Sequence, residues 1–399
     1  MILAAFTKEV SILKVYSKSI KEILKKYYEF RYWGTLYRNM AKTIINGDQL
    51  GEYTPYINKP GIAFSFDDSY RVYEWYKYGK PIFDKNDVKV TFNINGVHPL
   101  KGNRLHNQQE IDLLLELQSD GHEIGNHGFK HQKATDFTNR HSIHKWLEEE
   151  IESLIDWMKK QSHSLTGATF KKPVSFAFPH FLFNEETVRE IIPVYFKIAR
   201  GHLDKDNLTS FNHSGFAPSI CLDGYYSCNL FYLKKILRLV KKSGRNLILT
   251  CHSILPENFN SDSDQIEEQY KRWGNWKISP NTIQEIICEA KKIDLEFYTT
   301  SEIAGIATFS DPNLEHAARE NLTLHDEQWI SIRDLMNIKE LDLSNKRISN
   351  LDGIQYFLGL EKLDLSDNQI SDFKLLKKLP RLKQLNIANN ALLSDEKAI

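Results

Sequence analysis

The sequence predicts an α/β fold with a mainly parallel sheet, followed by a small repeat domain. From residue 61, short apolar runs alternate with stretches of helical periodicity, which is the pattern of successive β-α units. Near Asp311-Pro312 this pattern changes to three leucine-containing segments spaced by 22 residues. A chain of 399 residues with 41% hydrophobic content is long enough for one large and one small domain. We therefore expect an N-terminal helical segment over 1–60, a large α/β domain over 61–308 and a repeat domain over 309–399.

Within the large domain, strands are predicted where apolar residues cluster in short runs: residues 62–66, 88–94, 122–125, 174–178, 194–198, 247–251 and 295–299. Helices are predicted where apolar residues recur at helical spacing: residues 108–118, 143–161, 185–192, 230–242 and 281–292. This many units predicts either a closed parallel barrel or an open doubly wound sheet. Periodicity alone does not distinguish the two.

Residues 8–42 carry apolar and aromatic residues at helical intervals between lysines, which predicts an amphipathic helix. Its polar face mixes both charges, so we expect it to pack on the neighbouring domain; contact with a membrane surface is the alternative. The apolar run at the start is too short for a signal-peptide core, and no stretch approaches 18 uninterrupted apolar residues. We expect a cytoplasmic protein without a transmembrane segment, or a secreted one if a natural leader is missing.

The charge and the cysteine content argue against two classes of protein, nucleic-acid-binding proteins and disulfide-rich scaffolds. Lys plus Arg and Asp plus Glu both number 52, so bulk electrostatics does not favour nucleic acid as a partner. The four cysteines are too sparse for a disulfide scaffold and have no metal-ligand spacing along the chain. We expect them to be buried thiols. They are Cys221, Cys228, Cys251 and Cys288.

The C-terminal segments match the leucine-rich repeat pattern, in which alternating leucines form a short strand and an asparagine closes the turn. The 22-residue step relates Ile338, Leu360 and Leu382; Leu341, Leu363 and Leu385; and Leu343, Leu365 and Ile387. Asn368 and Asn390 occupy the asparagine position, whereas Lys346 replaces it in the first repeat and is expected to weaken that turn.

The segment that starts at Asp311, together with residues 332–335, resembles the helical caps of bacterial, internalin-like repeat domains. So few repeats need such a cap, and we expect them to dock on the larger domain or to bind a protein partner. Their exposed strand faces, which include Lys339, Glu340 and Asp342, are charged and suit a polar protein surface.

Two groups of residues in the large domain suggest metal chemistry. Phe64-Ser-Phe-Asp-Asp places Asp67 and Asp68 at the C-terminal end of a strand, the edge where α/β sheets build their sites. Neighbouring carboxylates can divide metal binding and proton transfer between them, although solvated turn residues are equally common in such pairs. Gly121-His-Glu-Ile-Gly-Asn-His supplies His127, and His131 follows four residues later, so that the two imidazoles can share a divalent ion. Surface histidines are the alternative, and strand alternation turns His122 away.

In this order, the Phe-Asp-Asp, the two histidines, an apolar strand ending in Pro-aromatic and a late strand ending in His252 resemble the polysaccharide deacetylase (NodB homology) family over about 240 residues. The resemblance implies a distorted parallel (β/α) barrel. It also implies that Asp67 is the general base, that Asp68, His127 and His131 hold Zn²⁺ or a similar divalent ion (Co²⁺, Ni²⁺ or Mn²⁺), and that His252 is the general acid. The oxyanion would be held by the metal and a backbone N–H near Phe181.

The sequence departs from that family in the third motif. Ala177 stands where the family has Arg, and His180 stands where it has Tyr. Arg200 resembles an Arg found further along in members that lack the first one, so it is expected to replace it; an ordinary surface or paired Arg is the alternative. Asp223 is a candidate for the fourth-motif Asp. The residues expected to contact substrate are Pro179, His180, Phe181 and Trp276, with Trp273 as a further candidate for the sugar site.

These observations lead to one preferred function and one alternative. The preferred function is metal-dependent hydrolytic removal of N-acetyl groups from acetamido sugars in a polysaccharide, an oligosaccharide or a lipid-linked glycan precursor. The alternative is a catalytically degenerate deacetylase fold that acts as an interaction or scaffold protein through its repeats. The enzyme is favoured because all five residues that the resemblance assigns to the reaction are present, namely Asp67, Asp68, His127, His131 and His252.

Overall fold

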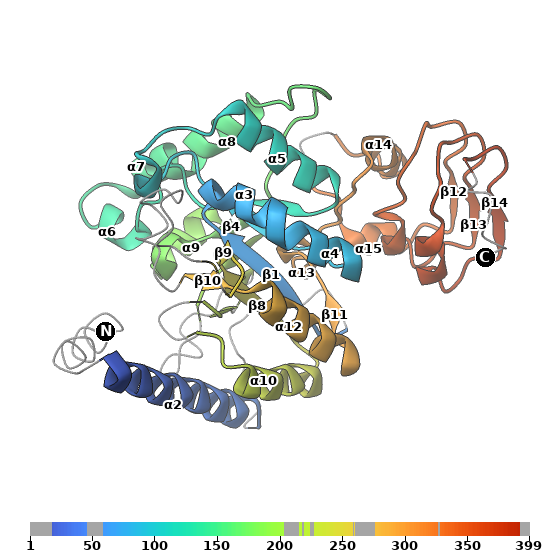
Figure 1. The fold of residues 1–399 in the computed structure, drawn as a ribbon. Coiled ribbons are helices and arrows are strands. Elements are labelled where there is room, and N and C mark those ends of the chain that lie inside the picture. Colours follow the sequence, from blue (N-terminus) through green and yellow to red (C-terminus); the bar gives the residue numbers. More distant parts are fainter. Residues whose placement is uncertain are drawn as a thin grey trace.

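The structure is a computed structural model that describes residues 18–45, 59–202, 215–217, 219–223, 227–257, 259, 276–325 and 328–391. Residues 8–17 of the predicted N-terminal helix lie outside this part of the chain. The described chain has a large N-terminal body and a C-terminal repeat domain at its right-hand side in Figure 1.

Nine parallel strands form the sheet of the large body in the described residues. They are β1 (Gly61–Asp67), β2 (Thr91–Ile94), β3 (Glu123–Asn126), β4 (Ser175–Ala177), β5 (Ile198–Arg200), β6 (Phe216–Ala217), β7 (Ser219–Cys221), β8 (Asn246–Cys251) and β11 (Glu296–Phe297). The order is β6-β5-β4-β3-β2-β1-β8-β7, and β11 also pairs with β1. Because β6 and β7 are close in the chain yet lie at opposite ends of this order, the sheet curls into a nearly closed barrel. The barrel expected from the family resemblance is confirmed.

The strands differ from prediction mainly in their bounds and their length. β5 begins at Ile198, so the predicted strand over 194–198 is wrong: residues 192–195 form a turn, and the Val194 side chain is exposed. The strands β6, β7, β9 (Ser253–Ile254) and β10 (Lys277–Ile278) were not predicted. Two or three residues are too few to show the alternation on which a strand prediction depends.

Helices cover the outside of the barrel. Those that correspond to predicted helices are α5 (Gln108–Ser119), the run α7 (Ile143–Trp146), η4 (Leu147–Glu152) and α8 (Ser153–Lys159), α9 (Glu185–Ile191), α10 (Leu230–Ser243) and α12 (Pro280–Lys292). Those that were not predicted include α3 (Val72–Glu74), η2 (Trp75–Gly79), α4 (Lys80–Asn86), α6 (Ala134–Thr138) and α13 (Thr300–Ile303). Side-chain caps define several helix starts: Asn107 and Glu110 form a capping box at α5, and Ser279 caps α12.

The N-terminal helix α2 (Lys18–Ile45) lies alongside α10 (Figure 1). Its side chains Trp33, Leu36 and Met40 are buried in the same hydrophobic core as the barrel, and Trp33 Nε1 donates to Ser227 O at 3.0 Å. The predicted packing on the large domain is therefore confirmed for the described part of the helix. Among the described helices, none is long and apolar enough to cross a membrane.

The prediction of four buried thiols is wrong in part. Cys251 is buried within β8, whereas Cys221 and Cys228 are partly exposed and Cys288 is exposed on α12. A cysteine on an amphipathic helix can face solvent, and spacing along the chain did not show which face Cys288 occupies.

The C-terminal repeats form three parallel strands, β12 (Glu340–Asp342), β13 (Lys362–Asp364) and β14 (Gln384–Asn386). Leu341, Leu363 and Leu385 are register partners, which confirms the 22-residue repeat. The helices α14 (Pro312–Asn321) and α15 (Ile332–Leu335) precede the first strand, and the short 3₁₀ segments η6 (Ile354–Tyr356) and η7 (Lys374–Lys378) connect the strands. The hydrophobic core of this domain is distinct from that of the barrel.

Asparagine side chains join consecutive turns of the repeat domain. Asn368 Oδ1 accepts hydrogen bonds from the N–H groups of Lys346 and Ile348, and Asn368 Nδ2 donates to Leu343 O and Leu365 O. The turn that lacks its own asparagine is therefore stabilised by the asparagine of the next repeat.

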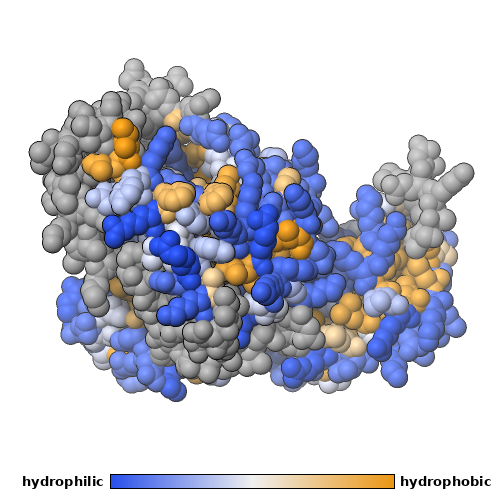
Figure 2. Space-filling model, turned by 90° about the horizontal axis from the view of Figure 1, so that it is seen from below, coloured by the Kyte–Doolittle hydropathy of each residue, from blue (hydrophilic) through white to orange (hydrophobic). Residues whose placement is uncertain are grey.

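The repeat domain contacts the barrel directly. Lys171 Nζ lies 2.6 Å from Glu315 Oε2 on α14, and the Tyr356 hydroxyl donates to Glu302 Oε1 on α13 at 2.7 Å. Lys172 lies over the ring of Trp329, with Nζ 4.5 Å from the ring centroid. The repeats appear as a separate lobe at the right of Figure 2, with hydrophilic and hydrophobic residues intermixed on its surface. The predicted intramolecular docking is thus present.

Candidate active site

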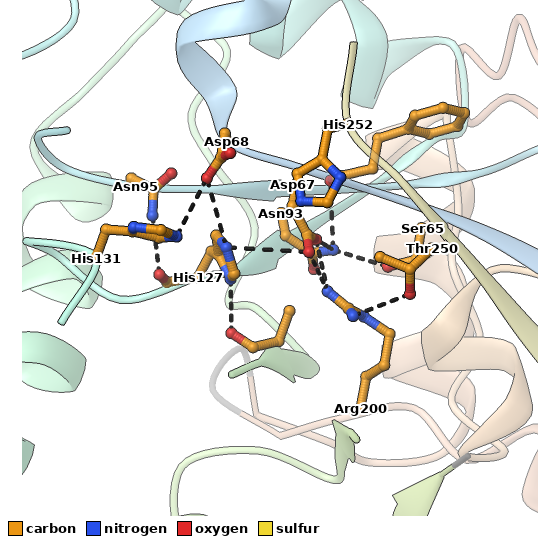
Figure 3. Close-up of polar contacts among 12 residues, drawn as sticks. Ser65, Asp67, Asp68, Asn93, Asn95, His127, His131, Arg200, Thr250 and His252 are labelled. Atoms are coloured by element: carbon orange, nitrogen blue, oxygen red, sulfur yellow. Dashed lines mark hydrogen bonds and ion pairs between the residues drawn. The ribbon is translucent and has the colours of Figure 1, made fainter. Parts of the chain in front are cut away.

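The C-terminal ends of five barrel strands bring the candidate residues together (Figure 3). Asp67 ends β1 and Asp68 follows it, His127 follows β3, and Arg200 ends β5. Asp223 and His252 follow β7 and β8, which are neighbours in the sheet. In a parallel sheet all strands end at the same edge, so residues far apart in the sequence meet there.

Asp68, His127 and His131 form a cluster whose ligand atoms all lie within 4.8 Å of one another. Nε2 of His131 lies 3.3 Å from Asp68 Oδ1, and Nε2 of His127 lies 3.6 Å from the same oxygen. His127 Nδ1 lies 2.7 Å from Ala177 O, so it carries the hydrogen of that bond and leaves Nε2 free to bind a metal. The left-handed backbone of Asp68 (φ 71°) and of His131 (φ 55°) positions their side chains.

The charge states of this cluster suit a divalent cation. Burial alone would raise the pKa of Asp68, but His131, His98 and Arg71 outweigh it and hold that pKa well below its ordinary value. Burial holds the pKa of His131 well below its ordinary value, although the charge of Asp68 opposes this. Asp68 Oδ1 is buried and has no hydrogen-bond partner among the described atoms. A buried carboxylate oxygen without a donor, close to Nε2 of His127 and of His131, fits a metal ion with two histidine ligands and one carboxylate ligand.

Asp67 is held by a buried cation and an amide. Arg200 Nη2 lies 2.6 Å from Asp67 Oδ1 and 2.5 Å from Oδ2, and Arg200 Nη1 donates to Thr250 Oγ1 at 3.0 Å. Asn93 Nδ2 on β2 donates to Asp67 Oδ1 at 2.9 Å. Both members of the ion pair are almost completely buried. Arg200 therefore lies in the place expected for the partner of the base, and is not a surface arginine.

His252 is paired with Asp223 on the neighbouring strand end. His252 Nδ1 lies 2.9 Å from Asp223 Oδ1, and the backbone N–H of His252 donates to Asp223 Oδ2 at 2.5 Å. Burial alone would lower the pKa of His252, but the charge of Asp223 and the hydrogen bond to it raise the pKa above its ordinary value. A histidine that stays protonated to higher pH and is oriented through Nδ1 is suited to donate a proton from Nε2.

The residues predicted to contact substrate lie near the histidines and the arginine described above, and they differ in how far their side chains are exposed. His180 is exposed, and its ring centroid is 4.6 Å from that of His131. The ring of Trp276 packs edge to face on His252 at 4.7 Å, and Phe181 lies under the Arg200 guanidinium. Pro179 is buried. Trp273 lies outside the described residues.

The expected oxyanion donor near Phe181 is not supported. The backbone N–H of Phe181 donates to Phe178 O at 3.0 Å within the short 3₁₀ turn η5 (Pro179–Phe181), and the next N–H, of Leu182, donates to Pro179 O at 3.2 Å. Donors that are already engaged in a turn are not available to a developing oxyanion in this conformation.

Several residues of the site were not identified from the sequence. His98 Nε2 lies 3.7 Å from Asp68 Oδ1, and Arg71 Nη2 lies 3.4 Å from Asp68 Oδ2. Glu150 accepts hydrogen bonds from the N–H groups of Lys130 and Gln132, which flank His131. These residues come from loops and from a helix, so no local pattern relates them to the motifs. The one signal available in the sequence was Arg71, an arginine three residues after Asp68; its burial is seen only in the structure.

The structure places His122 away from this centre. Its Nδ1 accepts a hydrogen bond from Val90 N at 3.2 Å, and its ring packs against Phe83 and Phe92 in the core. Burial lowers its pKa to about 3, so the ring is neutral. This position agrees with the alternation argued from the sequence.

Several solved structures are similar to parts of this chain. An internalin from Listeria monocytogenes is 28% identical over 22% of this chain and 26% of its own, with a TM-score of 0.21. A family 4 carbohydrate esterase from Bacillus anthracis is 17% identical over 66% of this chain and 90% of its own, with a TM-score of 0.36. A CE4 family pseudoenzyme from Bacillus anthracis is 14% identical over 63% of this chain and 68% of its own, with a TM-score of 0.37. The chain spans 26% and 37% of the lengths of two internalins that it matches.

A comparison with family models assigns the two parts of the chain. The polysaccharide deacetylase model matches residues 56–193, and a leucine-rich repeat model matches residues 359–397. A search of curated proteins finds no match. The first match includes Asp67, Asp68, His127 and His131, and the second includes β13 and β14. The chain therefore joins a domain of the polysaccharide deacetylase family to C-terminal leucine-rich repeats.

Proposed function

We propose that this protein is a metal-dependent hydrolase that removes N-acetyl groups from acetamido sugars of a glycan. The observation that carries the proposal is the convergence of three groups at one edge of the barrel: the cluster of Asp68, His127 and His131, the carboxylate of Asp67, and the imidazole of His252. A cation site, a base and an acid are the components that hydrolysis of an amide requires.

Each residue of the site has its own role in the proposed hydrolysis. A divalent ion held by Asp68, His127 and His131 would act as a Lewis acid on the acetyl carbonyl. Asp67 accepts the proton of the attacking water, and Arg200 holds the Asp67 carboxylate in its position. His252 delivers a proton to the departing sugar amine through Nε2, while Asp223 holds Nδ1. The rings of His180 and Trp276 lie against those of His131 and His252, and they would flank the bound sugar.

The competing function is a degenerate domain that serves as a scaffold for the repeats. Its main support was the altered third motif, because Ala177 cannot pair with the base. In the structure, Arg200 makes that pair from the next strand, which favours an active enzyme. The charged outer faces of β12 and β13 remain available to a polar protein partner, so the two roles can coexist.

The full chain provides the test. Metal content and acetate release from chitooligosaccharides are measured for the wild type, for Asp67→Asn, and for Asp294→Asn as a control at an exposed site. We expect about one divalent ion per chain and acetate release that a chelator abolishes and Zn²⁺ restores. Asp67→Asn should lower turnover about 10²- to 10⁴-fold, whereas the control should not. No metal and no acetate from any acetylated sugar would exclude the proposal.

A further inference from the structure

A second group of metal-binding side chains lies beside the proposed acid. Cys221 ends β7, Asp223 follows two residues later, and His252 follows β8, the strand that pairs with β7. Cys221 Sγ lies 3.6 Å from Asp223 Oδ1, and His252 Nδ1 lies 2.9 Å from the same oxygen. One ligand atom from each of the three residues lies within 4.8 Å of the others. No residue of this group belongs to the cluster of Asp68, His127 and His131.

These distances are close to those of a single bound ion. Tetrahedral Zn²⁺ has bonds of about 2.0 Å to nitrogen and oxygen and about 2.3 Å to sulfur, which places its ligand atoms roughly 3.3–3.5 Å apart. The Cys221 and Asp223 atoms are already near that separation. The His252 and Asp223 atoms are hydrogen-bonded and need to separate by roughly 0.4 Å, a change that loss of the Nδ1 proton favours.

The ligand types and their charges also suit a soft divalent ion. A thiolate and a carboxylate carry two negative charges, which a divalent ion neutralises, and a neutral imidazole completes the set. Asp223 and His252 are buried, whereas Cys221 is partly exposed and leaves a side of the group accessible. On binding, one proton leaves Cys221 Sγ and one leaves His252 Nδ1, both to solvent.

We propose that Cys221, Asp223 and His252 form a second metal site, one that takes thiophilic divalent ions such as Zn²⁺ or Cd²⁺ and whose occupation inhibits the enzyme. The binding part stands on the geometry alone; the inhibitory part rests on the proposed function, in which His252 is the acid. An ion on Nδ1 breaks the hydrogen bond to Asp223 and leaves a neutral ring that carries its proton on Nε2. That ring is a far weaker acid than imidazolium, so the amine no longer receives its proton. Zinc thus activates through one cluster and inhibits through the other.

Metal binding at this site is tested with the full chain and Cd²⁺ as the probe. The protein is first loaded with one equivalent of Zn²⁺ and then titrated with Cd²⁺, while the ultraviolet charge-transfer band of a cadmium–thiolate bond is recorded. We expect the band to saturate near one equivalent in the wild type and to disappear in Cys221→Ala. Cys228→Ala and Cys288→Ala, which remove a partly exposed and an exposed thiol elsewhere, should retain it. A wild type without the band, or a Cys221→Ala variant that keeps it, overturns the proposal.

The inhibitory part is tested by acetate release as a function of added Zn²⁺, with each variant normalised to its own rate at one equivalent. We expect the wild type to lose activity at higher Zn²⁺, and Cys221→Ala to need at least about tenfold more Zn²⁺ for the same loss. Equal inhibition of both proteins overturns the inhibitory role. If neither protein releases acetate, the proposed function fails, while the cadmium titration still decides whether the site exists, because the cluster of Asp68, His127 and His131 contains no sulfur.

Discussion

Ala177 and Arg200 are register partners on the neighbouring strands β4 and β5, and the guanidinium of Arg200 pairs with both carboxylate oxygens of Asp67. The charged partner of Asp67, the proposed base, thus lies on β5, at the same level of the sheet as Ala177 on β4. We expect Arg200→Ala to lower kcat/KM for deacetylation about 10²-fold or more. It should also lower the free energy of unfolding by about 3–5 kcal/mol, because Asp67 is left buried without its cation. Steady-state kinetics and denaturant unfolding measure the two effects.

A compensating substitution is the control for that prediction. Ala177→Arg added to Arg200→Ala returns a guanidinium to the opposite register position, and we expect it to recover part of the lost activity. Unchanged kinetics in Arg200→Ala alone would show that Asp67 needs no charged partner.

His98 should raise the affinity of the cluster of Asp68, His127 and His131 for a divalent ion without binding the ion itself. Its Nδ1 accepts a hydrogen bond from Leu100 N at 3.1 Å, which leaves the proton of the neutral ring on Nε2, 3.7 Å from Asp68 Oδ1. Burial lowers the pKa of His98 to about 4, so the ring is neutral near pH 7. We expect His98→Ala to weaken Zn²⁺ binding about 10- to 100-fold, measured by competition with a chromophoric chelator. His144→Ala, at an exposed position, should bind as the wild type does; equal affinities in all three proteins would contradict the role.

The contact between Glu302 and Tyr356 should make the stability of the docked repeat domain depend on pH. Burial raises the pKa of Glu302 to about 7 from an ordinary value of 4.5, and the hydrogen bond from Tyr356 opposes this. A raised carboxyl pKa stabilises the folded state below about pH 4.5, and this stabilisation is lost as the pH rises through about 7. The loss is up to about 3 kcal/mol.

We therefore expect the thermal midpoint of the wild type to fall between pH 5 and pH 8 by more than that of Glu302→Gln. Glu340→Gln, at an exposed strand position, is the control and should follow the wild type. Scanning calorimetry at both pH values gives the comparison. Parallel pH profiles for the wild type and Glu302→Gln would mean that Glu302 does not titrate in this range.

Asn368 should contribute more to the stability of the repeat domain than an exposed asparagine does. Its side chain is buried and bonds backbone groups of two successive turns, including Ile348 N at 2.9 Å and Leu343 O at 2.7 Å. We expect Asn368→Ala to lower the free energy of unfolding by about 3 kcal/mol, because several buried backbone groups lose their partners. Asn386→Ala, on the exposed face of β14, should change it by less than about 0.5 kcal/mol. Similar losses for both variants, measured by urea unfolding, would contradict this prediction.

Much of the architecture could be predicted because local patterns encode it. The alternation of strands and helices, the 22-residue repeat and the packing of α2 follow from hydrophobic periodicity, and the structure confirms them. The strand β5 was misplaced because Val194, although β-branched, lies in an exposed turn, and propensity does not report exposure. The exposure of Cys288 was missed for a similar reason.

The sequence alone determined which residues were candidates for the metal cluster, since the spacing of His127 and His131, together with the resemblance to the polysaccharide deacetylase family, was enough to select them and Asp68. Only the tertiary structure decided how the site is tuned. It brought Arg200 to Asp67, Asp223 to His252, His98 to Asp68 and Cys221 to Asp223. The partners in the first three pairs are tens to hundreds of residues apart, and they meet because parallel strands of a closed barrel all end at one edge. Spacing within a segment determines which ligands can share an ion, whereas the charges around them depend on which strands lie side by side.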